Sequence, residues 1–130
     1  MRKYRVGIAA MVHDHLWGEL AHWSKLQNAE IVAAGDENEE LRAKVQAEYG
    51  VPKLYSSWQE MIESEELDIV QAAAPNNAGA EIVEACAAKG IHVISEKPMA
   101  ARLEQADRML AAAEKAGAKL MINWPTAWQP

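Results

Sequence analysis

The feature that most constrains the fold is the regular alternation of short apolar runs with longer segments whose apolar residues recur every three to four positions. The apolar runs predict buried strands at 4–11, 31–35, 67–74, 91–95 and 119–123. The segments between them predict helices at 15–27, 39–49, 58–62, 78–89 and 102–116. Buried strands joined through helices pair in parallel by right-handed crossovers. We therefore predict an α/β, doubly wound, Rossmann-like sheet with strand order 3-2-1-4-5, which a sixth edge strand would extend.

Local signals place several of the helix ends. Asn38 is a candidate N-cap, and Gly50 is placed to end the helix that follows it. The segment 57–60, Ser-Trp-Gln-Glu, has the pattern of a capping box before another helix. Between these two helices, Val51-Pro52 predicts the start of a loop.

Composition excludes several classes of function. The chain has 130 residues, enough for one domain with its own core. It carries 19 acidic and 13 basic residues and no basic cluster beyond 2–5, which argues against nucleic acid as the main partner. Cys86 is the single cysteine, so no internal disulfide is possible and a reducing cytoplasm is expected. No stretch approaches the roughly 20 apolar residues of a membrane span.

The segment Glu96-Lys97-Pro98 follows the predicted strand 91–95. Proline disfavours helical geometry at the residue before it, which places Lys97 just beyond the carboxyl end of the strand. In open parallel sheets ligands bind at that edge. An ammonium group there could orient a substrate hydroxyl or carbonyl, or transfer a proton. The alternative is a solvated loop lysine.

The loop after the first strand lacks the glycine-rich sequence of a dinucleotide site. Ala10, Val12 and His15 stand where G-x-G-x-x-G has its glycines. The second glycine allows the backbone to approach the pyrophosphate closely, and a β-branched Val12 side chain fills that space. A dinucleotide would therefore lie differently or bind weakly here, or the loop serves another purpose.

Asp36 ends the second strand, roughly 20 residues after that loop, where a carboxylate can accept hydrogen bonds from the adenosine ribose. Asp36 and Glu37 would repel the 2′-phosphate of NADP, and no basic residue follows directly, so NAD is the preferred cofactor. The alternative for Asp36 is a turn or helix-capping role. Pro75 and Asn76 follow the third predicted strand at the same edge, where Asn76 could contact ligand or simply form a turn.

His13 and His15 flank Asp14 in the same loop. Histidine and aspartate ligate transition metals, but no sequence pattern supplies the remaining ligands, so no metal site is predicted. Imidazoles facing the cleft and an Asp14 that caps the next helix are expected instead. Cys86 lies on an apolar helical face and is expected in the core.

Three of these segments together carry a resemblance. With Gly35-Asp36, Ala74-Pro75-Asn76 and Glu96-Lys97-Pro98 after successive strands, the chain from about residue 5 to 123 resembles one domain. The domain that it resembles is the N-terminal nucleotide-binding domain of the glucose–fructose oxidoreductase/inositol dehydrogenase (Gfo/Idh/MocA) family. The resemblance implies that Lys97 lies near nicotinamide and substrate and assists proton transfer, and that Asp36 holds the adenosine ribose.

The remaining cofactor contacts are expected from the strand ends that surround these two residues. They are Ala10, Val12, His13, His15, Pro75, Asn76 and Glu96. Two positions depart from the family pattern: the glycine fingerprint is missing, and Gly79 stands where a histidine is common.

The resemblance also implies a second domain that supplies substrate contacts and the usual dimer interface. Residues 1–123 then form the dinucleotide-binding domain, and the apolar tail 124–130 lies where the substrate domain would begin. The expected function is the nucleotide-binding half of an NAD(P)-dependent oxidoreductase acting on a sugar, polyol or related hydroxy compound. Its partners are then cofactor and substrate, with no nucleic acid and no membrane, and this chain alone is expected to be inactive.

The alternative is a non-catalytic Rossmann-like module that has lost dinucleotide affinity or that self-associates. Trp124 and Trp128 in the tail suggest a surface covered by a homodimer partner or by a second domain.

Overall fold

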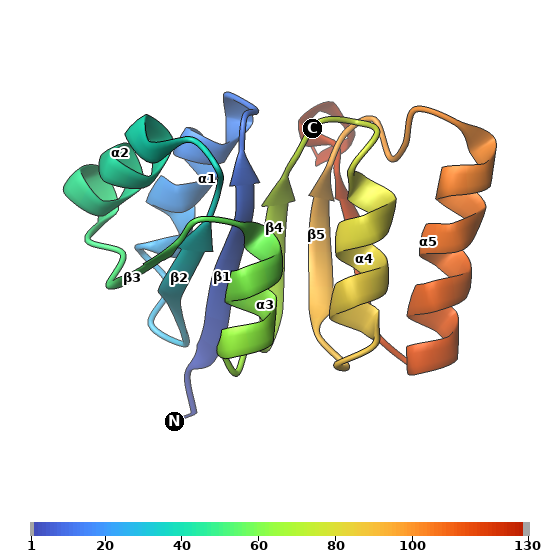
Figure 1. Ribbon diagram of the computed structural model, residues 1–130, viewed down its shortest axis with the longest axis horizontal. Helices are drawn as coiled ribbons and strands as arrows, with labels where there is room; N and C mark the ends of the chain where they lie inside the picture. The colour runs from blue at the N-terminus through green and yellow to red at the C-terminus, as the bar shows by residue number, and fades with distance from the viewer. Residues whose placement is uncertain (1, 129–130) are drawn as a thin grey trace.

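Six strands form one parallel sheet (Figure 1). The structure, a computed structural model, describes residues 2–128. The strands are β1 (Tyr4–Met11), β2 (Ala29–Gly35), β3 (Lys53–Tyr55), β4 (Ile69–Ala73), β5 (His92–Glu96) and β6 (Leu120–Asn123). Their order across the sheet is β3-β2-β1-β4-β5-β6, and every neighbouring pair is parallel. The predicted parallel sheet with order 3-2-1-4-5 is confirmed, and a sixth strand extends it, but the run 67–74, third of the predicted strands, pairs with β1 and does not occupy position 3.

The edge strand β3 belongs to a segment that the sequence places in a loop. β3 follows Val51-Pro52 and pairs with β2 from Ala33 opposite Lys53 to Gly35 opposite Tyr55. Three residues at a sheet edge are too few to show the periodicity of a strand, and this explains the difference. The run 67–74 is consequently the fourth strand of the chain.

Helices cover both faces of the sheet, as predicted. They are α1 (His15–Trp23), α2 (Glu39–Tyr49), α3 (Trp58–Ser64), α4 (Gly79–Ala87) and α5 (Leu103–Ala116), with a 3₁₀ turn η1 at Pro125–Trp128. Figure 1 shows α3, α4 and α5 on one face and α1 and α2 on the other. Within residues 2–128, no helix is both long and apolar enough to cross a membrane.

The alternation of side chains along β1 divides the core into two clusters. Val6 and Ile8 pack in the cluster that contains Leu16 and Leu20 of α1. Ala9 points the other way, into the cluster formed with α3, α4 and α5. Such two-sided burial explains why β1 is a continuous apolar run rather than an alternating one.

The predicted helix caps are confirmed in part. The Asn38 side chain accepts hydrogen bonds from the backbone of Glu40 and Leu41, and Gly50 ends α2 in left-handed geometry with φ +65°. Ser57 accepts from the backbone N–H of Glu60 at 3.1 Å. The reciprocal half of the capping box is absent, because the Glu60 carboxylate accepts a hydrogen bond from the Ser56 hydroxyl instead.

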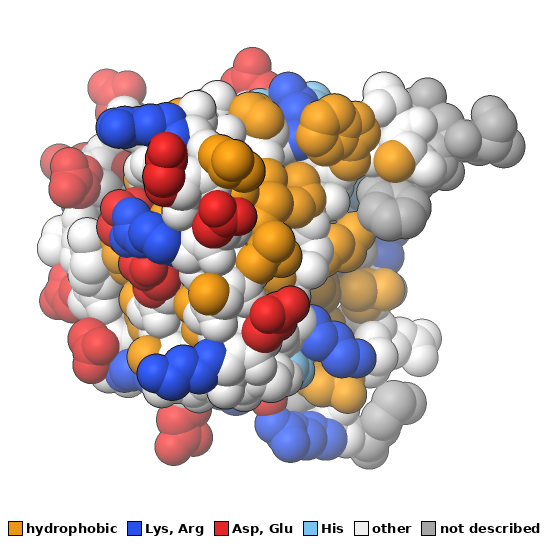
Figure 2. Space-filling model, turned by 90° about the vertical axis from the view of Figure 1, so that its right-hand side faces the viewer, with side chains coloured by type: hydrophobic (Ala, Val, Ile, Leu, Met, Phe, Trp, Pro, Cys, Tyr) orange, Lys and Arg blue, Asp and Glu red, His pale blue; other side chains and the backbone are white. Residues whose placement is uncertain are grey.

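One face of β5 and β6 has no helix over it among the described residues. A hollow of about 210 Å³ lies there, and its lining includes Trp23, Leu26, Ile94 and Met121. Leu26 and Met121 are 48% and 41% exposed. Figure 2 views the molecule from the α5 side and shows hydrophobic side chains exposed among the charged ones.

Candidate functional site

The carboxyl ends of β1, β2 and β4 surround a small pocket of about 180 Å³. Its lining consists of Ala10, Val12, Asp36, Glu37, Trp58 and Pro75. Four of the predicted cofactor residues are therefore brought together: Ala10, Val12, Asp36 and Pro75. Trp58, the first residue of α3, was not predicted as a site residue, because the motif for a dinucleotide site contains no signal for it.

The backbone at the end of β1 is irregular, and the pairing of β1 with β4 shifts register between Ala9 and Met11. Ala10 has φ +59°, a left-handed conformation that glycine adopts more readily. The backbone N–H of Val12 donates to the carbonyl of Ala73, and the Val12 side chain is 54% exposed at the pocket. The valine methyl groups therefore occupy the opening rather than the core.

Asp36 is a buried carboxylate that organises this part of the backbone. Its Oδ2 accepts from the backbone N–H of Met11 at 2.7 Å, and its Oδ1 accepts from that of Asn38 at 2.7 Å. The turn role that the sequence left open is thus present. A carboxylate oxygen accepts more than one hydrogen bond, so a ribose contact is compatible with it. Arg42, one turn into α2, donates to the backbone carbonyls of Asp36 and Glu37.

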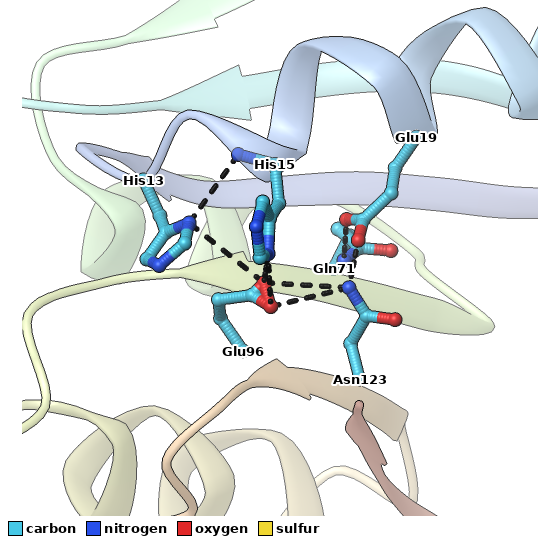
Figure 3. A network of polar contacts seen from close by, with 6 residues as sticks. All are labelled: His13, His15, Glu19, Gln71, Glu96 and Asn123. Carbon is cyan, nitrogen blue, oxygen red and sulfur yellow. Dashed lines mark hydrogen bonds and ion pairs between the residues drawn. The ribbon is translucent and has the colours of Figure 1, made fainter. Parts of the chain in front are cut away.

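A second group of polar side chains lies between the β1 loop and the end of β5 (Figure 3). His15 Nδ1 lies 3.2 Å from Glu96 Oε1, and His13 Nδ1 lies 3.9 Å from Glu96 Oε2. The imidazole centroids are 4.5 Å apart. Asp14 occupies the N-cap position of α1 but makes no capping hydrogen bond with its side chain.

The network continues onto residues that the sequence did not single out. The Asn123 amide donates to Glu96 at 3.2 Å and also to Glu19, and Gln71 donates to Glu19 at 2.6 Å. Burial, and then the charge of Glu96, raise the pKa of Glu19 to about 7. Glu19 lies one helical turn after His15, so their proximity follows from the sequence. The proximity of Glu19 to β5 and β6 depends on how the chain crosses over the sheet, and no pattern of neighbouring residues predicts it.

Lys97 follows Glu96 directly and is half-buried. Its side chain makes no hydrogen bond or ion pair with another residue between 2 and 128. The Lys97-Pro98 peptide bond is cis. Asn76 is an exposed turn residue after β4. Cys86 is buried in the core as predicted, and burial raises the pKa of its thiol to about 12.

A larger hollow, of about 480 Å³, lies at the opposite edge of the sheet. Arg2, Arg5, Glu65 and Asp68 are among its lining residues. The Arg5 guanidinium pairs with Glu65, and Asp68 pairs with Arg2 and accepts a hydrogen bond from the Arg5 backbone N–H. Burial disfavours the charged form of Glu65, but hydrogen bonds from Lys53 and Tyr55, together with the charges of Lys53 and Arg5, hold its pKa below the usual value. These charged side chains already form ion pairs with one another, so the carboxyl edge of the sheet remains the better candidate for a ligand site.

Comparison with known proteins decides the family. The profile described as "Oxidoreductase family, NAD-binding Rossmann fold", that of Gfo/Idh/MocA, matches residues 6–124. The chain belongs to this family. The Gfo/Idh/MocA relatives include D-apiose dehydrogenase of Paraburkholderia graminis, 39% identical over 96% of this chain and 32% of the relative. The D-xylose 1-dehydrogenase (NADP(+)) 2 of Haloferax volcanii is 33% identical over 78% of this chain and 31% of the relative.

Among solved structures, the WlbA dehydrogenase of Bordetella pertussis, in complex with NADH and UDP-GlcNAcA, superposes with a TM-score of 0.86. The two chains are 29% identical, and the superposition covers 94% of this chain and 37% of the WlbA chain. The chain spans about a third of the length of the curated relatives it matches. The family binds NAD(P), and the names of these relatives include both NADH and NADP(+).

Proposed function

We propose that this chain is the nucleotide-binding half of an NAD-dependent oxidoreductase that acts on a sugar, a polyol or a related hydroxy compound. The observation that supports it best is the buried Asp36 carboxylate at the end of β2, in a pocket that Ala10 and Val12 of the β1 loop also line. A carboxylate in that place is suited to the adenosine ribose.

In this proposal the dinucleotide extends along the carboxyl edge of the sheet. The ribose lies at Asp36 and the pyrophosphate beside the loop of residues 10–15, while the nicotinamide lies towards Glu96 and Lys97. Pro75 and Asn76 border the path between the two ends. The nicotinamide supplies the hydride chemistry when bound. Lys97 holds and transfers a proton at the substrate hydroxyl, a role for which its ammonium has no competing partner among the described residues.

NAD is the proposed cofactor rather than NADP. Asp36 and Glu37 both line the pocket, where their carboxylates would repel a 2′-phosphate. Arg42 acts in the opposite sense, because its positive charge would attract a 2′-phosphate. Its guanidinium is held close to the pocket by hydrogen bonds to the backbone carbonyls of Asp36 and Glu37. We expect NAD to bind more tightly than NADP, and Arg42→Ala to weaken NADP binding without changing NAD binding.

Calorimetric titration tests the proposal directly. NAD should bind the wild-type chain weakly, in the high micromolar range or above, because Val12 occupies the opening of the site. Val12→Gly should strengthen binding by roughly tenfold, near 1.4 kcal/mol, and Ala10→Gly should add to this. Leu26→Gly removes a comparably exposed apolar side chain after α1 and should leave affinity unchanged.

Two outcomes would contradict the proposal or its steric argument. Wild-type affinity of about 1 μM would show that Val12 does not obstruct the pyrophosphate. Affinity that stays flat in both glycine variants would mean that the loop does not hold phosphate, which favours the non-catalytic module. Location in the cytoplasm and pairing with a substrate domain remain predictions.

The role of Lys97 requires a chain that carries the substrate domain, and no turnover is expected from residues 1–130 alone. In a longer chain, Lys97→Ala should lower kcat and leave NAD affinity nearly unchanged. Weak NAD binding with normal turnover would instead place Lys97 in cofactor binding.

A further inference from the structure

The Glu96 carboxylate is buried without a permanently charged partner. Its side chain is only 3% exposed, and within residues 2–128 its ion pairs are with His13 and His15 alone. The other contact is the Asn123 amide, which also donates to the Glu19 carboxylate. Buried carboxylates are generally paired with a cation or bound to a metal ion. A cation bound by Glu96 and the two imidazoles would supply such a partner.

Three donor atoms of the right kind converge there. One nitrogen from each of His13 and His15 and one oxygen of Glu96 all lie within 4.8 Å of one another. Ligands of a tetrahedral zinc ion, each about 2.1 Å from the metal, lie about 3.4 Å apart. His15 Nδ1 lies 3.3 Å from Glu96 Oε2, which already fits, and His13 Nδ1, 3.9 Å from the same oxygen, must approach it by a small side-chain rotation.

We propose that His13, His15 and Glu96 form a binding site for a divalent transition-metal ion of the zinc class. Two imidazoles with one carboxylate suit zinc and its neighbours, whereas calcium and magnesium prefer oxygen ligands. Three protein ligands leave at least one coordination position open, as in zinc sites that also bind water or a small ligand.

The surroundings of the three ligands favour this geometry. Asn123 donates to both oxygens of Glu96, at 3.2 and 3.3 Å, which orients the carboxylate towards the histidines. His13 Nδ1 accepts a long hydrogen bond of 3.3 Å from the backbone N–H of His15, and a metal bound at that nitrogen would displace it. His13, the ligand that must rotate, lies in the loop between β1 and α1, so such a rotation leaves the sheet unchanged.

The proposed ion goes beyond the oxidoreductase function, and its ligands are inferred without reference to that function. His13 and His15 also lie in the loop proposed to hold the dinucleotide, while Glu96 lies towards its nicotinamide end. The metal and the nicotinamide end of the dinucleotide should therefore compete. Among the three ligands, only His13 and His15 stand together in the sequence. The third, Glu96, comes from β5, 81 residues after His15.

The test is metal titration of the untagged 130-residue chain after treatment with a chelator that is then removed. Calorimetry with Zn²⁺ should give one site with a Kd of about 1 μM or tighter. Co²⁺ should give the intense visible absorption of a four-coordinate ion with nitrogen and oxygen ligands. His15→Ala and Glu96→Gln should each weaken binding at least tenfold, whereas His22→Ala, which removes an exposed histidine of the same helix, should not.

Circular dichroism of each variant separates loss of a ligand from loss of the fold, and Glu96→Gln keeps the size of the side chain. Absence of Zn²⁺ and Co²⁺ binding to the wild-type chain would overturn the proposal, as would equal affinity in wild type, His15→Ala and Glu96→Gln. Because metal is titrated without dinucleotide, and NAD is titrated without metal, failure of one site is distinguishable from failure of the other.

Discussion

Two carboxylates, Glu19 and Glu96, are the residues whose environment differs most from what their sequence neighbours suggest. Glu19 lies on a helix with a polar residue one turn before it, the usual setting of a solvated side chain. In the folded chain it shares the Asn123 amide with Glu96 and is half-buried. Burial disfavours its charged form, and the charge of Glu96 adds to the effect.

This raised pKa predicts a pH dependence of stability. The pKa of Glu19 rises from 4.5 to about 7 on folding, so its contribution to stability is complete below 4.5 and is lost as pH rises through about 7. Because the side chain is only half-buried, solvent screens the effect, and the loss is on the order of 1 kcal/mol. Glu19→Gln should flatten the decline in stability between about pH 5 and 8.

Urea denaturation across that pH range, with a chelator present, measures the effect. The exposed Glu48→Gln should keep the wild-type slope. A Glu19→Gln variant whose stability declines as steeply as that of the wild type would show that Glu19 is not the group responsible.

At the scale of elements, the end of β2 and the start of α3 approach each other closely at Gly35. A Cβ placed on Gly35 would lie 2.5 Å from the carbonyl oxygen of Ser57 and 2.8 Å from the Cα of Trp58. Both contacts are with backbone, which has little freedom to move. Gly35 therefore allows α3 to reach the pocket that Asp36 and Trp58 line.

Alanine substitution at two glycines should have opposite effects. Gly35→Ala should lower the free energy of unfolding by roughly 2 kcal/mol or more, because overpacking against backbone forces the elements apart. Gly18→Ala should raise it by about 0.5–1 kcal/mol, since Gly18 lies in α1 with no atom within 4 Å of the added Cβ. Chemical denaturation of both variants is the measurement. Equal stability of Gly35→Ala and wild type would disprove the close approach.

At the scale of the whole molecule, the uncovered face of β5 and β6 is the main departure from a closed domain. Met121 and Leu26 are exposed there, and Trp124, just after β6, is 48% exposed. Pro125 of the tail lines a hollow with His15, Glu19 and other residues of α1. The tail thus runs beside α1, while the Trp128 side chain lies outside the part of the chain that the structure describes.

We predict that the chain self-associates through this face and the tail, as a symmetric dimer, because burying the exposed apolar side chains is favourable and twofold pairing is the commonest arrangement. Light scattering should show a dimer for the full chain and a smaller species for a chain ending at Asn123. Two monomers of equal stability would show that the tail takes no part in association.

The sequence by itself determined the α/β class, the parallel doubly wound sheet and the caps at Asn38 and Gly50, because periodicity and capping are local properties of a few neighbouring residues. It also placed Asp36 and Lys97 at strand ends, and the family resemblance built on them is confirmed. Tertiary structure alone decided that β3 is a strand, that Trp58 lines the Asp36 pocket, and that Glu96 meets His13 and His15. These contacts join residues far apart in the chain, so only the packing of crossovers onto a parallel sheet brings them together.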